Sequence, residues 1–203
     1  MAMTAHVVDL ARMAIGDPAQ PESVYCSGGR ILYEDNREIP DIQAVTYQYD
    51  DFPMTCESAV FGNYMTKSSP EIRFGDKFPD WKLNSTRIEV YGTDRMMCLG
   101  IMGGGWQVLD EDGEVCDQEY GYFPDENHLR NFIECVRSRK KPNGDILQGH
   151  RSASLIHLAN LAYRAGNKQL YVDRETETIT NSARARELSK GYYRKPYQLP
   201  EVI

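Results

Sequence analysis

The chain has no long apolar run and no excess of positive charge. No stretch of its 203 residues approaches the roughly 20 apolar residues that a membrane-spanning helix needs, so no membrane partner is expected. The net charge of −7 argues against nucleic-acid binding, because contact with the phosphate backbone needs a basic face. The basic run over 137–141 lies at the end of an expected helix, where cations interact favourably with the helix dipole.

Closely spaced cysteines and targeting signals are also missing. Five cysteines are spread along the chain without a CxxC pair, so we expect reduced, partly buried thiols and neither a disulfide framework nor a metal site. The N-terminus has no basic segment followed by an apolar stretch, so it does not resemble a signal peptide. We therefore expect a cytoplasmic protein, although the leader of a longer protein would not be visible here.

The order of predicted elements is one helix, then five or six strands, then helices. Apolar side chains follow helical spacing over 5–15 and form one stripe (Val7, Leu10, Ala11, Ala14 and Ile15). Strand patterns follow at 23–31, 42–51, 54–63, 86–92, 96–102 and 106–110. Asp112-Gly113 is a hairpin signal. We expect a long loop or insertion over 64–85 and an extended tail over 192–203.

Two later helices are predicted over 125–140 and about 150–165. The first has the apolar stripe Leu129, Phe132, Ile133 and Val136, and the second has Leu155, Leu158, Ala159 and Ala162. The whole chain, 1–203, then reads as one α+β domain: a large, open, mainly antiparallel sheet with helices packed on one face. Strand tyrosines such as Tyr47 and Tyr49 suit a sheet face that forms a homo-oligomer, although ordinary half-exposed tyrosines would give the same pattern.

The glycine-rich segment 100–106 is the only one that suggests a phosphate loop. Such a loop needs a strand before it and a helix after it, whereas a strand pattern follows here. The segment DEDGE at 110–114 is too short for a calcium loop. We therefore expect a bend between strands, and we assign neither cofactor-binding nor metal-ligating residues.

The four histidines are the natural candidates for acid–base work, because only histidine titrates near neutral pH without perturbation. His6 and Asp9 lie three residues apart on one helix, so a carboxylate could orient the imidazole. His150 is placed at a predicted helix start beside Arg151, where it either caps the helix or contacts an anion or a sugar oxygen. His128 is expected to be exposed, and His157 to pack in the core.

Three segments, in this order, resemble the Gfo/Idh/MocA (glucose–fructose oxidoreductase/inositol dehydrogenase) family of bacterial type. They are HVVDLARMAIGDPAQPESVYCSGG at 6–29, REIPDIQAVTYQY at 37–49 and GHRSASLIHLANLAYRAGNKQLYVDRETETI at 149–179. The resemblance implies the C-terminal domain of the family, which binds substrate and forms oligomers. It also implies an oxidoreductase that uses NAD or NADP on a sugar, polyol or related hydroxyl compound.

The resemblance assigns roles to two residues. His6 matches the acid/base histidine of the family motif, and Asp9 matches the aspartate that supports it. The family motif also has an aspartate four residues before the histidine, and in this sequence that position is Ala2. The dinucleotide-binding Rossmann domain is missing from this sequence, so we expect no cofactor bound to this chain alone and no activity from it alone. The alternative is a stand-alone, non-catalytic module that binds a sugar or forms a dimer.

Overall fold

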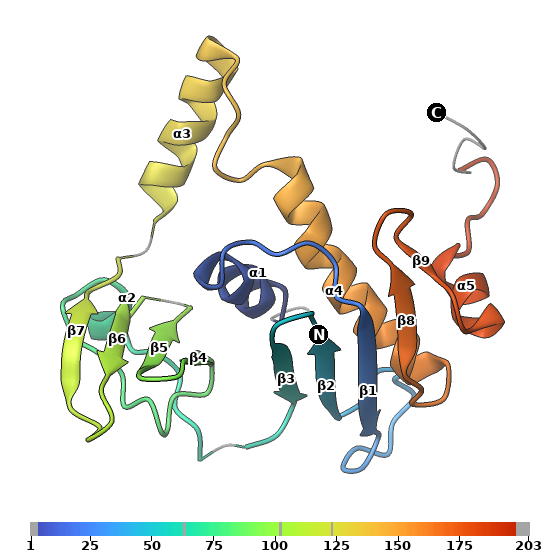
Figure 1. Cartoon of the computed structure of the whole chain (residues 1–203), viewed down its shortest axis with the longest axis horizontal. Helices are drawn as coiled ribbons and strands as arrows, with labels where there is room; N and C mark the ends of the chain where they lie inside the picture. Colours follow the sequence, from blue (N-terminus) through green and yellow to red (C-terminus); the bar gives the residue numbers. More distant parts are fainter. Residues whose placement is uncertain (1–3, 63, 102, 123, 198–203) are drawn as a thin grey trace. The chain divides into compact units, whose positions relative to one another are not determined.

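The computed structural model describes residues 4–62, 64–101, 103–122 and 124–197. Across these residues the chain forms five helices and nine strands, which confirms the α+β class (Figure 1). The chain divides into two compact units, Met1–Pro18 with Phe61–Ser152 and Ala19–Val60 with Ala153–Ile203. None of the described helices has the length and apolar character needed to cross a membrane.

The first unit holds a four-stranded antiparallel sheet in the order β4-β5-β6-β7. Its elements are α1 (Thr4–Ala14), α2 (Pro70–Arg73), β4 (Arg87–Tyr91), β5 (Met96–Gly100), β6 (Trp106–Leu109), β7 (Val115–Glu119), α3 (Asp125–Ser138) and the start of α4 (Ile146–Arg164). The β6–β7 hairpin turns at Gly113, which has a φ of 82°, as the Asp-Gly signal predicts. Over 64–85 the chain forms α2 and a bridge between Thr66 and Asn84.

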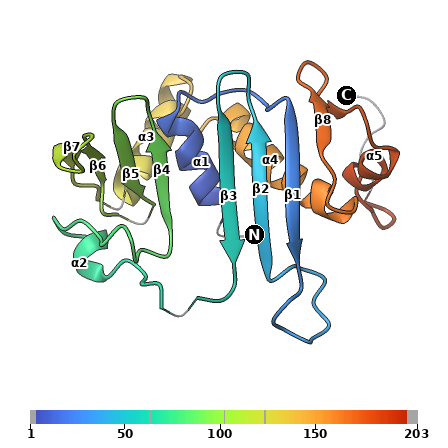
Figure 2. The ribbon, with the colours of Figure 1, turned by 60° about the horizontal axis from the view of Figure 1, so that its bottom comes forward.

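The second unit holds a five-stranded antiparallel sheet in the order β3-β2-β1-β8-β9. Its elements are β1 (Ser23–Gly29), β2 (Ile42–Gln48), β3 (Pro53–Ala59), the rest of α4, β8 (Leu170–Asp173), β9 (Thr178–Ile179) and α5 (Ala183–Ser189). Figure 2 shows β1, β2 and β3 side by side, with α4 behind them. The expected tail has no helix or strand over 192–197, and residues 198–203 lie outside the described residues.

One face of the five-stranded sheet is covered by α4. Val24, Cys26 and Val45 are buried on this face, and the α4 stripe predicted from the sequence is buried as well. The Tyr47 hydroxyl donates a hydrogen bond to the Leu155 carbonyl oxygen at 2.9 Å. Helices therefore pack on this face of the sheet, as predicted.

Two expectations about side chains on these elements are wrong. Tyr47 and Tyr49 are 1% and 5% exposed, so they belong to the core and not to an open sheet face. Tyr25 and Tyr171 are the exposed tyrosines of β1 and β8. His157 is exposed rather than packed in the core, because helical spacing places it opposite the buried stripe of α4.

The helix predicted at 5–15 is present as α1, but a different face is buried most deeply. Val8 is 2% exposed and Arg12 is 1% exposed, whereas the predicted stripe is only half-buried. Arg12 is drawn inward because oxygen atoms of α4 and of the loop after α1 surround its guanidinium group. Spacing of apolar residues alone could not reveal this, because the pattern treats arginine as a surface residue.

Candidate functional site

A buried arginine joins α1 to the first turns of α4. Arg12 Nη1 donates hydrogen bonds to Ser152 Oγ at 2.8 Å and to the Gln148 carbonyl oxygen at 3.3 Å. Its Nη2 donates to Gln148 Oε1 and to the Pro18 carbonyl oxygen, both at 3.0 Å. A buried guanidinium is stable only when its donors find acceptors, so these bonds fix the helix that carries His6 against the segment that carries His150.

Asp9 is part of the same network. Ser152 Oγ accepts from Arg12 and donates to Asp9 Oδ1 at 2.5 Å. The hydroxyl thus links a buried cation to a carboxylate at the surface. Because Ser152 belongs to α4, this bond makes Asp9 a link between α1 and α4. The sequence had suggested only a local role beside His6.

His6 lies three residues before Asp9 on α1, and its side chain is exposed. Ala2, where the family motif has its first aspartate, lies outside the described residues. His150 is exposed and Arg151 is half-buried, and both directly precede Ser152. The Arg12–Ser152–Asp9 network therefore brings together the two helical segments that carry all four residues predicted from the sequence.

The expected helix start at His150 is wrong. Helix α4 begins at Ile146, one turn earlier. Asp145 supplies the N-terminal cap, since its Oδ2 accepts a hydrogen bond from the Leu147 backbone N–H at 3.3 Å. His150 therefore lies past the free N–H groups of the first turn, and any contact it makes with a ligand must come from its imidazole ring.

Three of the five cysteines, Cys26, Cys56 and Cys98, are poor nucleophiles. Burial raises the pKa of Cys26 and of Cys98, and it raises the pKa of Cys56 to about 11. These thiols are protonated at neutral pH, and thiol chemistry at these positions is not supported. Within the described part of the chain, no three potential ligands are grouped so that they could hold a metal ion.

The glycines at 103–105 do not fit a dinucleotide. They have positive φ values of 85°, 84° and 60° and connect β5 to β6. A Cβ atom on Gly103 would lie 2.5 Å from the Arg73 Cα atom, and one on Gly105 would lie 1.8 Å from the Glu119 carbonyl oxygen. Glycine is needed here because other segments of the chain pack against this backbone, so nothing favours a phosphate cradle.

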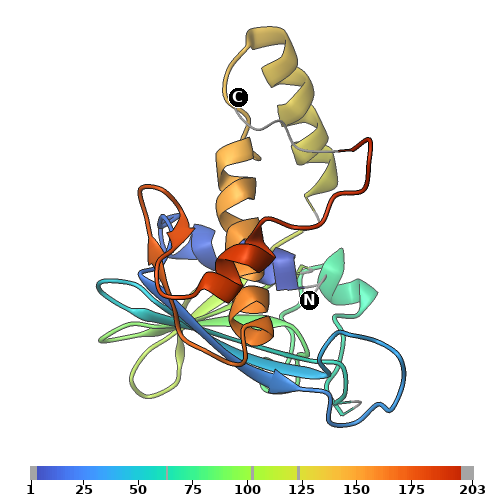
Figure 3. The ribbon, with the colours of Figure 1, turned by 90° about the vertical axis from the view of Figure 1, so that its right-hand side faces the viewer.

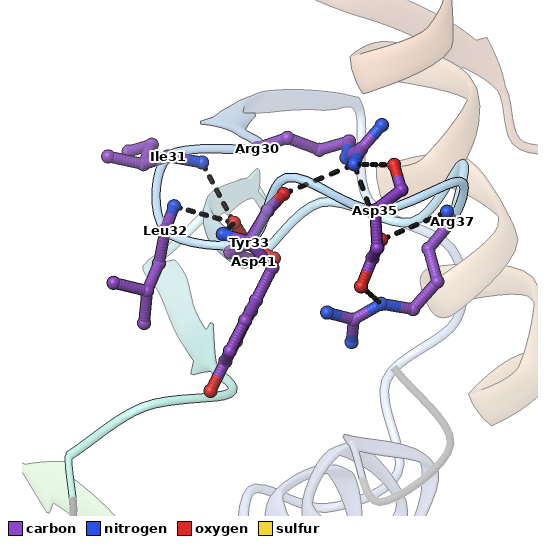
Figure 4. Close-up of polar contacts among 7 residues, drawn as sticks. All are labelled: Arg30, Ile31, Leu32, Tyr33, Asp35, Arg37 and Asp41. Carbon is purple, nitrogen blue, oxygen red and sulfur yellow. Dashed lines mark hydrogen bonds and ion pairs between the residues drawn. The ribbon is translucent and has the colours of Figure 1, made fainter.

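A second polar cluster orders the loop between β1 and β2 (Figure 4). Asp41 is 3% exposed, and its Oδ2 accepts backbone N–H bonds from Ile31 and Leu32 at 2.8 Å and from Tyr33 at 3.1 Å. These bonds hold the pKa of Asp41 below its ordinary value, the Tyr33 N–H most of all. The Asp35 carboxylate accepts a hydrogen bond from Arg37 Nε at 2.6 Å and also forms an ion pair with Arg30. Every partner belongs to the same loop or flanks it, so the cluster supports loop structure and not catalysis.

Residues 103–199 match the sequence model of an oxidoreductase family, described as its C-terminal alpha/beta domain (GFO_IDH_MocA_C2). Residues 103–199 carry the C-terminal alpha/beta domain of the Gfo/Idh/MocA family. This match includes His150 and Arg151, whereas His6 and Asp9 precede it. Among curated proteins, none is similar enough to this chain to count as a match.

Solved oxidoreductases share the fold of this Gfo/Idh/MocA domain. A candidate oxidoreductase from Thermotoga maritima has a TM-score of 0.59 and 13% identity, over 83% of this chain and 45% of that one. UDP-N-acetylglucosamine 3-dehydrogenase from Acidithiobacillus ferrooxidans has a TM-score of 0.54 and 13% identity, over 78% and 44%. An Agrobacterium radiobacter oxidoreductase, solved with NAD+, L-tartaric acid and magnesium, has a TM-score of 0.51 and 18% identity, over 87% and 49%. The chain thus spans about half the length of these proteins.

Proposed function

We propose that this Gfo/Idh/MocA domain is the substrate-binding and oligomerisation part of an NAD(P)-dependent oxidoreductase that acts on a sugar, polyol or related hydroxyl compound. The Arg12–Ser152–Asp9 network is the observation that carries the proposal, because it holds the α1 segment with His6 against the α4 segment with His150 and Arg151. A rigid support of this kind is what positioned acid–base groups require. Two proteins of similar fold, named above, are a UDP-sugar dehydrogenase and an oxidoreductase solved with a hydroxy acid.

In this proposal His6 moves the proton of the substrate hydroxyl group. Its imidazole ring is exposed and therefore accessible to a substrate hydroxyl group. His150 and Arg151 contact the substrate, with Arg151 supplying a permanent positive charge for a carboxylate or phosphate oxygen. Asp9 holds α1 in place through Ser152, and so acts as a positioning residue rather than as a catalytic one.

In this proposal a separate domain binds the dinucleotide, and the packing of the glycines at 103–105 against other segments of the chain supports this. We therefore expect the chain alone to bind substrate without oxidising it. Incubating the isolated chain with NAD+ or NADP+ and a panel of sugars, polyols and hydroxy acids should give no reduced cofactor. Turnover in that assay would contradict this part of the proposal.

Binding can be tested directly by NMR, using UDP-N-acetylglucosamine and L-tartaric acid as probes. We expect one of them to shift the ring signals of His6 and His150 and to leave those of His157 unchanged. His157 is the control, since it is also exposed and lies two turns further along α4 than His150. Equal shifts at all three histidines, or none with either probe, would contradict the proposed site. Binding without activity even beside a dinucleotide-binding domain would favour a stand-alone sugar-binding module.

A further inference from the structure

Helix α3 carries an apolar stripe with no partner among the described residues. Leu129, Phe132, Ile133 and Val136 are 62%, 55%, 46% and 47% exposed, and no residue of α3 is buried. Four large apolar side chains on successive turns of one helix form a continuous patch. Patches of this kind commonly mark a surface that contacts another protein.

The segment between α3 and α4, residues 139–145 (the return segment), packs along a different face of α3. The Asn143 backbone N–H donates a hydrogen bond to Asn131 Oδ1 at 2.9 Å, and Gly144 lies beside the His128 ring. Figure 3 shows this segment running next to α3. Helical spacing places Asn131 and His128 roughly a third of a turn away from the stripe. The return segment therefore supports the helix and leaves the stripe uncovered.

The two ends of α3 carry opposite charge. Asp125 and Glu126 form its first turn, whereas Arg137 lies in its last turn and is followed by Arg139 and Lys140. When two such helices lie antiparallel, each acidic end meets a basic end. In a parallel pair, like charges would meet at both ends. For a pair of α3 helices, the charge pattern therefore favours the antiparallel direction.

We propose that α3 pairs with α3 of a second copy of this chain, antiparallel about a two-fold axis that passes between Phe132 and Ile133. In this arrangement Leu129 lies opposite Val136 of the other copy. Phe132 and Ile133 each lie near their own counterparts. Both the apolar stripe and the charged ends are then complementary to themselves, which a two-fold contact requires.

The contact is small, which sets its expected strength. Four side chains from each copy, at on the order of 100 Å² each, bury about 800 Å² in total, below the size of a standard stable interface. We therefore expect a weak, concentration-dependent dimer. Sedimentation velocity over a concentration series measures it with the chain as it exists.

A substitution at the centre of the stripe tests whether the stripe forms the contact. Phe132→Asp should weaken association at least about tenfold, because it places a carboxylate in the middle of an apolar contact. The side chain is not part of a core, so folding should be unaffected. Ile31→Asp is the matched control, since Ile31 is an apolar residue that is 74% exposed in the β1–β2 loop. A chain that stays monomeric throughout the series, or equal effects of the two substitutions, would overturn the proposal.

Charge reversal tests the role of the ends. Chains with Asp125→Lys and Glu126→Lys, and chains with Arg139→Glu and Lys140→Glu, should each associate less than the parent, because like charges then meet. A mixture of the two should regain association, since every end contact is again between opposite charges. A mixture no better than either variant alone would overturn the proposal.

Cross-linking tests the direction of the pair. With exposed Cys116 and with Cys135 replaced by serine throughout, Leu129→Cys and Val136→Cys chains should form disulfide-linked dimers when mixed and far fewer when oxidised separately. Residue 129 lies opposite residue 136 only in the antiparallel arrangement. Dimers of the Leu129→Cys chain alone would show parallel pairing and overturn the proposal. So would a mixture without cross-linked dimers.

Discussion

Replacing Arg12 with leucine should destabilise the first unit strongly, although the substitution adds an apolar side chain to a buried position. The guanidinium makes four hydrogen bonds to oxygen atoms of Ser152, Gln148 and Pro18. Each buried acceptor left without a donor costs roughly 1–3 kcal/mol, and the loss is partly offset because a charge no longer has to be buried. We expect a net loss of about 3 kcal/mol in the free energy of unfolding.

The chain offers a convenient assay for this loss. Both tryptophans, Trp81 and Trp106, lie in the first unit, so tryptophan fluorescence during urea denaturation reports on that unit. A loss of about 3 kcal/mol shifts the midpoint by about 1 M or more, given urea slopes of roughly 1–3 kcal/mol per M. Arg130→Leu is the control, since Arg130 is 59% exposed and pairs with Glu126 along α3. Equal midpoints for the two variants would refute the reasoning about the network.

Three further predictions follow from particular contacts. Tyr47→Phe should lower the free energy of unfolding by about 1 kcal/mol in urea denaturation, because the Leu155 carbonyl oxygen loses the buried hydroxyl that donates to it. Gly105→Ala should lower the thermal midpoint more than Gly113→Ala does, since a Cβ clashes only at the first position and both have positive φ. The lowered pKa of Asp41 stabilises the loop above the ordinary carboxyl pKa, and this contribution is lost as pH falls through the lowered value. NMR should therefore show the amides of 31–33 titrating with a midpoint below about 4; a midpoint above it would contradict the assignment.

Local patterns predicted most of the fold. Strand β2 has the alternation of a half-buried strand, and the stripe of α4 from Leu155 to Ala162 is buried as helical spacing requires. The Asp-Gly turn before β7 is set by two residues alone. Such elements depend on neighbours in sequence, and the sequence shows those directly.

The parts that sequence could not predict depend on contacts between distant segments. Tyr47 looks like a surface tyrosine until α4 supplies the Leu155 carbonyl oxygen. Arg12 is buried among acceptors that include Ser152, which lies 140 residues later in the chain. Asp9 was singled out for its spacing from His6, and its partner proved to be on another helix. Residue types and spacing in the sequence indicate a candidate site, whereas the contacts that join its two helices are visible only in the fold.

The most direct test of the proposed function measures the role of His6 when a dinucleotide-binding domain is joined ahead of the chain. Reduction of NAD(P)+ would be followed by absorbance over a range of pH, for the parent and for His6→Ala and His157→Ala. We predict that His6→Ala lowers the rate by about 10²–10⁴-fold and removes one ionisation from the pH profile of the rate. His157→Ala should behave like the parent. Equal rates and equal pH profiles for the two variants would contradict an acid–base role for His6.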